Sequence, residues 1–213
     1  MNGGLPITLT HLATQLSLVV GGGAVAERKV RALLDANARV RVIAPTLTDE
    51  LADLARGGKI EWLPRVYRSG DLAEAFLVIA ATDEPQVNRT VAQEAQARGS
   101  LVNVVDDPDY SNFIAPAVVR RGDLTIAIST GGDVPALAGH LRAQLEQEFG
   151  DEWSAYVEWL ARIRPQIAAR FPGLEARRQV WKRVLNSDLR EWITARGDEE
   201  IQARILQILE NSS

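Results

Sequence analysis

The stretch "LSLVVGGGAVAERKV", residues 16–30, decides the fold of this chain. An apolar run typical of a buried strand is followed by three glycines and then by a segment with helical periodicity. Gly21, Gly23 and Ala26 fit the pattern G-x-G-x-x-A. In this pattern the first glycine permits a tight turn, the second lets the backbone approach a pyrophosphate, and the small third residue lets helix and strand pack closely. The stretch therefore predicts a strand, a turn and a helix that bind a dinucleotide.

The start of the predicted helix offers a place for the anion. The N–H groups near Ala24 and Val25 would face the pyrophosphate, because the first turn of a helix has N–H groups without partners. The alternative is a tight turn that needs glycine only for its geometry. The position of the motif between a strand and a helix favours dinucleotide binding.

Short β-rich runs and helical stretches alternate through the first hundred residues. We expect strands at 16–20, 39–44, 59–63, 76–81 and 101–105, with helices that include 24–37 and 86–99. Near-continuous apolar strands that alternate with helices are typical of a parallel sheet covered on both faces. Residues 1–112 are therefore predicted to form a Rossmann-like α/β domain that binds NAD.

The pattern changes after residue 112. Two β-rich runs within 113–130 are joined by "RRGD" (120–123) without room for a crossover helix, which predicts an antiparallel hairpin with Arg120 and Arg121 in its turn. A glycine turn and a helix follow. From Asp151 the chain is helical and charged, and we expect interruptions at Pro165 and at "FPG" (171–173). We predict a hairpin and helix region at 113–150 and an all-helical region at 151–213.

Composition limits the function classes. The chain has 213 residues, a net charge of −4 and no cysteine. This composition argues against nucleic acid as a partner and excludes a disulfide framework or thiolate metal site. We see no signal-peptide pattern and no apolar run of membrane-spanning length. We therefore expect a soluble cytoplasmic protein without a membrane partner.

Two further strand ends bear on the cofactor. The second strand ends "VIAPT" (42–46), with Pro45 and Thr46 where dinucleotide-binding domains usually have Asp or Glu, so ribose contacts come from backbone groups or from Thr46. No Arg follows directly to bind a 2′-phosphate, which favours NAD over NADP. Thr82 and Asp83, after the fourth strand, are expected to line the nicotinamide side. Alternatively, Asp83 caps the next helix.

Three carboxylates follow the fifth strand in "NVVDDPDYSNFIAP" (103–116). Asp106 directly follows the strand, at the edge of the sheet where the cofactor is expected. Asp107 and Asp109 flank Pro108 and are typical of a turn. The residues alone leave open whether the cluster is a solvated turn or includes a working carboxylate.

Several segments occur in a set order that is similar to a known family. They are "VVGGGAVAERKVRALLDANARVRVIAP", "LVIAATDEPQVN", "LVNVVDDPDYSNFIAPAVVRRGDLTIAISTGG" and "PALAGHLRAQLE". Together they resemble the precorrin-2 dehydrogenase/sirohydrochlorin ferrochelatase family, the N-terminal module of siroheme synthase, over about residues 5–150. The resemblance implies NAD-dependent oxidation of precorrin-2 to sirohydrochlorin and, in some members, insertion of ferrous iron. It also implies a homodimer whose interface includes the hairpin region.

The resemblance assigns roles to particular residues. It implies that Asp106 is catalytic, and a carboxylate there could also take pyrrole protons or briefly hold iron, with His140 as a second transient contact. No permanent metal site is expected. The substrate has eight carboxylates, so arginines should surround it. The substrate-binding candidates are Asn103, Arg120, Thr130, Gly131, Gly132 and Arg142. Val134 stands where the family commonly has Ser, so this chain departs from the family pattern in that loop.

The first part of the helical region is basic and contains several tryptophans. The basic residues are Arg162, Arg164, Arg170, Arg177, Arg178, Lys182 and Arg183. They form either a solvated helix face or a surface that closes over the substrate carboxylates. The tryptophans are expected in a core or an interface. Three functions remain open: a dehydrogenase that also chelates iron, a dehydrogenase alone, or a non-catalytic NAD-sensing regulatory module.

Overall fold

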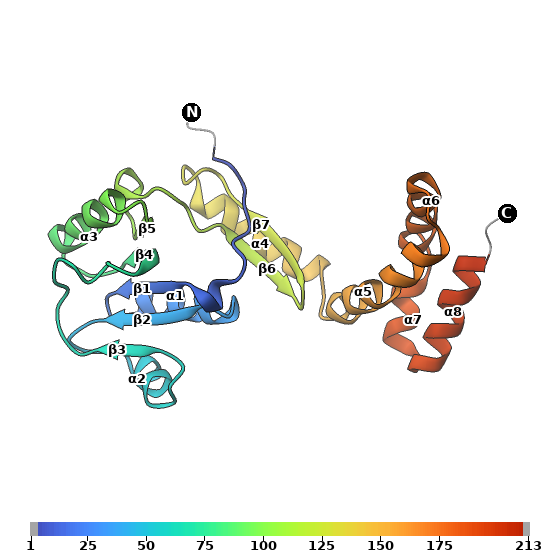
Figure 1. The fold of residues 1–213 in the computed structure, drawn as a ribbon, viewed down its shortest axis with the longest axis horizontal. Helices are drawn as coiled ribbons and strands as arrows, with labels where there is room; N and C mark the ends of the chain where they lie inside the picture. The colour runs from blue at the N-terminus through green and yellow to red at the C-terminus, as the bar shows by residue number, and fades with distance from the viewer. Residues whose placement is uncertain (1–3, 211–213) are drawn as a thin grey trace. The chain divides into compact units, whose positions relative to one another are not determined.

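The computed structural model describes residues 4–210 and divides the chain into two compact units, Met1–Ala115 and Pro116–Ser213. The first unit contains a five-stranded parallel sheet with the strand order β3-β2-β1-β4-β5 (Figure 1). The strands are β1 (Leu16–Val20), β2 (Arg39–Ile43), β3 (Glu61–Leu63), β4 (Ala75–Ala80) and β5 (Leu101–Val104). The predicted Rossmann-like α/β fold is confirmed, and all five expected strands lie within about two residues of the predicted bounds.

Helices cover both faces of this sheet. Helix α1 (Ala24–Asp35) and helix α2 (Asp49–Arg56) share one core cluster with Val19, Val42 and Ile79. Helix α3 (Pro85–Ala97) lies in a second cluster with Leu18, Val78 and other residues of the opposite face. Neighbouring strand residues alternate between the two clusters because side chains of a strand point to opposite faces. The result is a three-layer sandwich with a short 3-10 helix, η1 (Leu12–Thr14), before it.

The second unit begins with the predicted hairpin. Strands β6 (Ala117–Arg121) and β7 (Leu124–Ile128) pair antiparallel, and helix α4 (Pro135–Glu148) follows. The expectation that Arg120 and Arg121 occupy the turn was wrong. They pair with Thr125 and Leu124 in the ladder, because Gly122, at φ 55, and Asp123 alone make the two-residue turn.

The rest of the second unit is helical, as predicted. It consists of α5 (Glu152–Arg170), α6 (Leu174–Leu185), α7 (Leu189–Ala195) and α8 (Asp198–Glu210). The expected interruption at Pro165 was wrong, since α5 continues through this residue. Ile163 and Ile167, on either side, are almost fully buried, and their packing keeps the helix in place despite the lost hydrogen bond. The predicted break after Arg170 is present.

Tryptophans contribute to the core of this helical region, as expected. Trp159 is buried in the cluster that joins α5, α6 and α8, and Trp153 and Trp181 pack against it. Within residues 4–210, no helix is both long and apolar enough to cross a membrane.

Candidate cofactor and active site

The three glycines after β1 have different structural roles. Gly21 has φ 128, and a Cβ there would lie 2.2 Å from the carbonyl oxygen of Ala81. A Cβ on Gly22 would lie 2.0 Å from the carbonyl oxygen of Thr46, whereas a Cβ on Gly23 would enter open space. Gly21 and Gly22 are therefore required by contacts within the protein. Gly23 leaves room for a ligand to approach the backbone. The sequence pattern assigned no role to Gly22.

Helix α1 begins with unsatisfied donors beside this open space. Gly23 is its N-cap and supplies no side-chain hydrogen bond. The first intrahelical bond runs from the Glu27 N–H to the Gly23 carbonyl, at 3.0 Å, so the N–H groups of Ala24, Val25 and Ala26 have no acceptor within the helix. Ala24 is exposed and Ala26 is fully buried against the sheet. This end of α1 fits a pyrophosphate, as the sequence predicts.

The sheet topology places the glycine loop at a topological switch point. β1 lies between β2 and β4, and the helices that follow β1 and β4 cover opposite faces of the sheet. Ligands of such sheets bind outside the carboxyl ends of the strands at this point. The predicted cofactor residues after β2 and β4, and Asp106 after β5, lie at the same edge because all five strands are parallel.

The loop after β2 is tied to the glycine loop. The Thr48 N–H donates to the Gly22 carbonyl at 3.0 Å, and the Thr48 hydroxyl donates to Glu27 at 2.6 Å. Arg31 forms ion pairs with Glu27 and Glu50, so two carboxylates neutralise its charge. Pro45 and Thr46 are exposed and remain the candidates for ribose contacts.

The loop after β4 is held by Asn88, a buried residue of α3. Its side-chain oxygen accepts hydrogen bonds from the Thr82 N–H and hydroxyl, and its Nδ2 donates to the Thr82 carbonyl. The alternative that Asp83 caps α3 was wrong. Glu84 is the N-cap, and its side chain accepts no hydrogen bond from the first turn of the helix. Asp83 is exposed, and its cofactor contact stays a prediction.

Sequence reasoning gave no role to Asn88. Its only signal is an amide side chain in "DEPQVN" at a helix position that packs against the apolar sheet. A buried amide needs hydrogen-bond partners, and the strand end supplies them.

Asp106 lies in the turn after β5 with φ 58, in the left-handed region. Its neighbours are fixed: the Val105 N–H donates to the Ala80 carbonyl at 2.9 Å, and the Asp107 N–H donates to the Val104 carbonyl at 3.3 Å. The side chain is exposed. The 3-10 turn η2 (Pro108–Tyr110) follows, as expected for this turn sequence. Asp106 thus stands on an anchored backbone and points into solvent-accessible space, as a proton acceptor would require.

Two side chains that the sequence analysis overlooked close the outer edge of β5. The Asn112 side chain accepts from the Val102 N–H at 2.7 Å and donates to the Ser100 carbonyl at 2.9 Å. The Ser111 hydroxyl accepts from the Val104 N–H at 2.9 Å. Asn103, a substrate-binding candidate, donates its amide to the Phe113 carbonyl at 3.2 Å. These bonds hold the chain on both sides of Asp106.

The cofactor candidates, Asn103 and Asp106 are brought together in the first unit, whereas the other substrate candidates belong to the second. Thr130 accepts a hydrogen bond from the Val134 N–H, and Gly131 and Gly132 have positive φ in the same loop. Arg142 forms an ion pair with Glu146 one turn later on α4. Arg120 and His140 are exposed.

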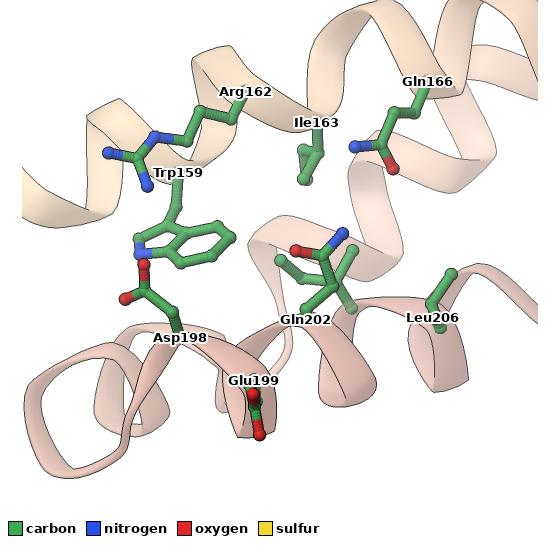
Figure 2. A pocket seen from close by; sticks show the side chains of 9 residues that line it. Trp159, Arg162, Ile163, Gln166, Asp198, Glu199, Gln202 and Leu206 are labelled. Carbon is green, nitrogen blue, oxygen red and sulfur yellow. The ribbon is translucent and has the colours of Figure 1, made fainter.

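A hollow of about 320 Å³ lies in the helical region of the second unit (Figure 2). Side chains of α5 and α8 point toward one another across it, among them Trp159, Arg162, Asp198 and Gln202. The guanidinium of Arg162 lies 5.0 Å from the centre of the Trp159 ring, one turn earlier on the same helix α5, at a distance typical of a cation–π contact. Within residues 4–210, no group of three or more metal-ligating side chains gathers.

Three models of known protein families match successive parts of the chain. The model of the putative NAD(P)-binding family matches residues 9–117. The models of the sirohaem biosynthesis protein central region and the sirohaem synthase dimerisation region match residues 121–148 and 152–209. The region named for dimerisation is thus the helical one, whereas our expectation had pointed to the hairpin.

Similar proteins include the siroheme synthase of Chromobacterium violaceum, 45% identical over 194 residues, which covers 91% of this chain and 41% of that protein. Siroheme synthase 1 of Aeromonas salmonicida is 45% identical over 195 residues, covering 92% and 42%. The chain spans about two fifths of these relatives. A solved structure named "SirC, precorrin-2 dehydrogenase" superimposes with a TM-score of 0.76 at 23% identity, over 97% of this chain and 100% of that one. The chain belongs to the putative NAD(P)-binding family, whose model matches residues 9–117, and its later parts are similar to the central and dimerisation regions of sirohaem synthesis proteins.

Proposed function

We propose that this chain catalyses the NAD-dependent dehydrogenation of precorrin-2 to sirohydrochlorin. Relatives at 45% identity are named siroheme synthases, and the solved structure with the same fold is named a precorrin-2 dehydrogenase. We propose the cytoplasm as the location of this reaction, as the sequence analysis expects.

The observation that carries the proposal is the position of Asp106 at the dinucleotide edge of the sheet. Gly23 and the start of α1 supply space and donors for the pyrophosphate, and Thr82 lies in the loop that follows β4, the strand beside β5. A carboxylate on an anchored turn at this edge suits proton transfer next to a hydride acceptor. A module that only sensed NAD would not need this carboxylate.

The proposed oxidation removes one hydride and one proton from the substrate, and each has an acceptor. NAD, when bound, supplies the acceptor for a hydride that leaves a substrate carbon. Loss of the accompanying proton completes the new double bond, and the Asp106 carboxylate accepts that proton. Because Asp106 is exposed, it can release the proton to solvent. Precorrin-2 is thereby oxidised by two electrons, and NAD is reduced by the same two.

Substrate binding and assembly extend the proposal to the second unit. The candidates for contacts with the eight carboxylates of the substrate remain Asn103 of the first unit and, in the second unit, Arg120, Thr130, Gly131, Gly132 and Arg142. A homodimer is supported by the match of residues 152–209 to a dimerisation region. The two-stranded β6–β7 sheet is a further candidate contact, because an isolated hairpin is only marginally stable.

The test supplies purified protein with precorrin-2 and NAD and follows NADH and sirohydrochlorin absorbance. Equal amounts of both products are expected. A protein that binds NAD but forms neither product would contradict the proposal and support the NAD-sensing alternative. In a second reaction the protein receives sirohydrochlorin and ferrous iron, which enters only as a possible second substrate. Siroheme formation above the uncatalysed rate would show that one chain performs both steps.

A further inference from the structure

The loop after β2 lacks the carboxylate that usually ends this strand in NAD-binding domains. Pro45 and Thr46 stand where such domains have the Asp or Glu that binds the hydroxyls of the adenosine ribose. That carboxylate also repels the 2′-phosphate that distinguishes NADP from NAD. In this chain, discrimination between the two nucleotides must therefore come from other charged groups beside the loop.

Thr48, the N-cap of α2, ties this loop to the glycine loop and to α1. Its N–H donates to the Gly22 carbonyl at 3.0 Å, and its hydroxyl donates to the Glu27 carboxylate at 2.6 Å. The same hydroxyl accepts the Leu51 N–H at 3.4 Å. The Glu27 side chain is only 18% exposed, so packing and this hydrogen bond fix its carboxylate. Glu27 thus places a negative charge beside the ribose loop, although it belongs to α1.

Arg31 lies one turn after Glu27 and joins α1 to the first turn of α2. Its Nη2 is 2.7 Å from a Glu27 carboxylate oxygen, and its Nε and Nη2 donate to the two carboxylate oxygens of Glu50. The Arg31 side chain is 51% exposed, so a ligand could reach it. An arginine near the end of β2 is the group that accommodates the 2′-phosphate in NADP-binding domains. Here two carboxylates occupy its donors and leave the cluster with a net negative charge.

Stability alone gives a weak reason for two carboxylates around one guanidinium. Arg31 and Glu50 are about half exposed, and exposed ion pairs contribute only about 0–1 kcal/mol to folding. The same charges act more strongly on a ligand that brings a further negative group to this edge of the sheet, because like charges placed together disfavour the wrong partner.

We propose that Glu27 and Glu50 determine the cofactor preference of this chain, because they mask Arg31, a latent partner for a 2′-phosphate. The inference rests on the proposed function, in which NAD is the cofactor. It assigns roles to two carboxylates that the glycine motif and the strand ends did not identify.

The first test is calorimetric titration of the double variant Glu27→Gln/Glu50→Gln with NAD and with NADP. Glutamine keeps an oxygen that can accept the Thr48 hydroxyl, so the charges are removed while the loop stays tied. The Kd for NADP should fall at least about tenfold, and the Kd for NAD should change less than about twofold. An unaltered ratio of the two Kd values would overturn the proposal.

The matched control is Asp49→Asn. Asp49 is exposed in the same turn of α2 as Glu50, and within residues 4–210 it forms no ion pair. Its substitution removes the same charge and should leave both Kd values unchanged. An equal gain in NADP affinity from Asp49→Asn would show that net charge alone acts, and would overturn the specific role of the Arg31 cluster.

The second test adds Arg31→Leu to the double variant. The Kd for NADP should rise again, because the gain depends on the unmasked guanidinium, and a Kd that stays low would overturn the role of Arg31. Glu50→Gln alone, at an exposed position, should shift the ratio in the same direction even if the double variant does not fold, and no shift would contradict the proposal. If the wild-type protein binds NAD but does not oxidise precorrin-2, the proposed function fails, and these titrations still decide the origin of the preference.

Discussion

Asn88 binds the end of β4 through Thr82 with three hydrogen bonds, of 2.8, 2.9 and 3.1 Å. Both main-chain polar groups of Thr82 are thereby satisfied by one buried side chain of α3. The loop expected beside the nicotinamide is therefore fixed before any cofactor binds.

Asn88→Ala should release this loop. We expect a loss of about 1–3 kcal/mol in the free energy of unfolding, because buried groups lose their partners, and a weaker affinity for NAD. Thermal unfolding and calorimetric titration with NAD measure the two effects. Thr90→Ala, which removes a local bond to the Gln86 carbonyl on an exposed part of α3, is the control. Equal effects of both changes would show that the loop does not depend on Asn88.

Substitutions of Gly22 and Gly23 should have different effects, the first on folding and the second on NAD binding. Gly22→Ala places a methyl group against the Thr46 carbonyl, and we expect a loss of about 2–3 kcal/mol or no folded protein. Gly23→Ala places the same group in open space at an ordinary φ of −85, so the variant should fold with a loss of at most about 1 kcal/mol, which reflects the poorer N-cap that Ala makes. Its Kd for NAD should rise about 10-fold or more, since the methyl group occupies the ligand's approach. Wild-type NAD affinity in Gly23→Ala would exclude this loop as the pyrophosphate site.

Acid should lower the stability of the first unit, because it protonates the carboxylate of Asp71. The hydrogen bonds from Arg65 hold the pKa of Asp71 below its usual range, burial opposes this effect, and the Arg68 N–H adds to it. A lowered folded pKa means that the unfolded chain binds the proton more tightly. The contribution to stability is therefore complete above about pH 5 and is lost as the pH falls below about 4.

Asp71→Asn should lower the Tm by roughly 2–4 °C at pH 7. The difference from wild type should shrink as the pH falls below about 4, because the wild-type carboxylate is then protonated as well. Thermal unfolding at several pH values measures this trend. Asp53→Asn, at an exposed pair with Arg56, is the control and should have little effect at any pH. A Tm difference independent of pH would contradict the assignment.

NAD should bind more tightly than NADP. The end of β2 offers Pro45 and Thr46, and Arg31 is neutralised by Glu27 and Glu50. A 2′-phosphate would therefore lose its solvation without gaining a cationic partner. Titration with each nucleotide should show at least about a tenfold preference for NAD, and Thr46→Arg should reduce that preference. A preference for NADP would contradict this account of the ribose site.

Local sequence predicts most of this fold because each strand is a short β-rich run and the glycine pattern fixes the first turn. Contacts between residues that are distant in the sequence cannot be predicted from local sequence in this way. Nothing near Gly22 indicates that Thr46 will approach it, and nothing near Asn88 indicates that a strand end needs its amide. Pro165 misled the prediction because buried neighbours outweighed its local preference for a helix break. The position of Asp106 follows from its strand.

The most direct test of the account is the turnover of Asp106→Asn with precorrin-2 and NAD. Asn tolerates the left-handed φ of 58 at this position, so the substitution removes the charge without straining the turn. Asp109→Asn is the matched control. We predict that Asp106→Asn binds NAD with wild-type affinity and forms NADH at least about 100-fold more slowly, while Asp109→Asn remains active. Wild-type turnover by Asp106→Asn would contradict the central claim that this carboxylate accepts the substrate proton.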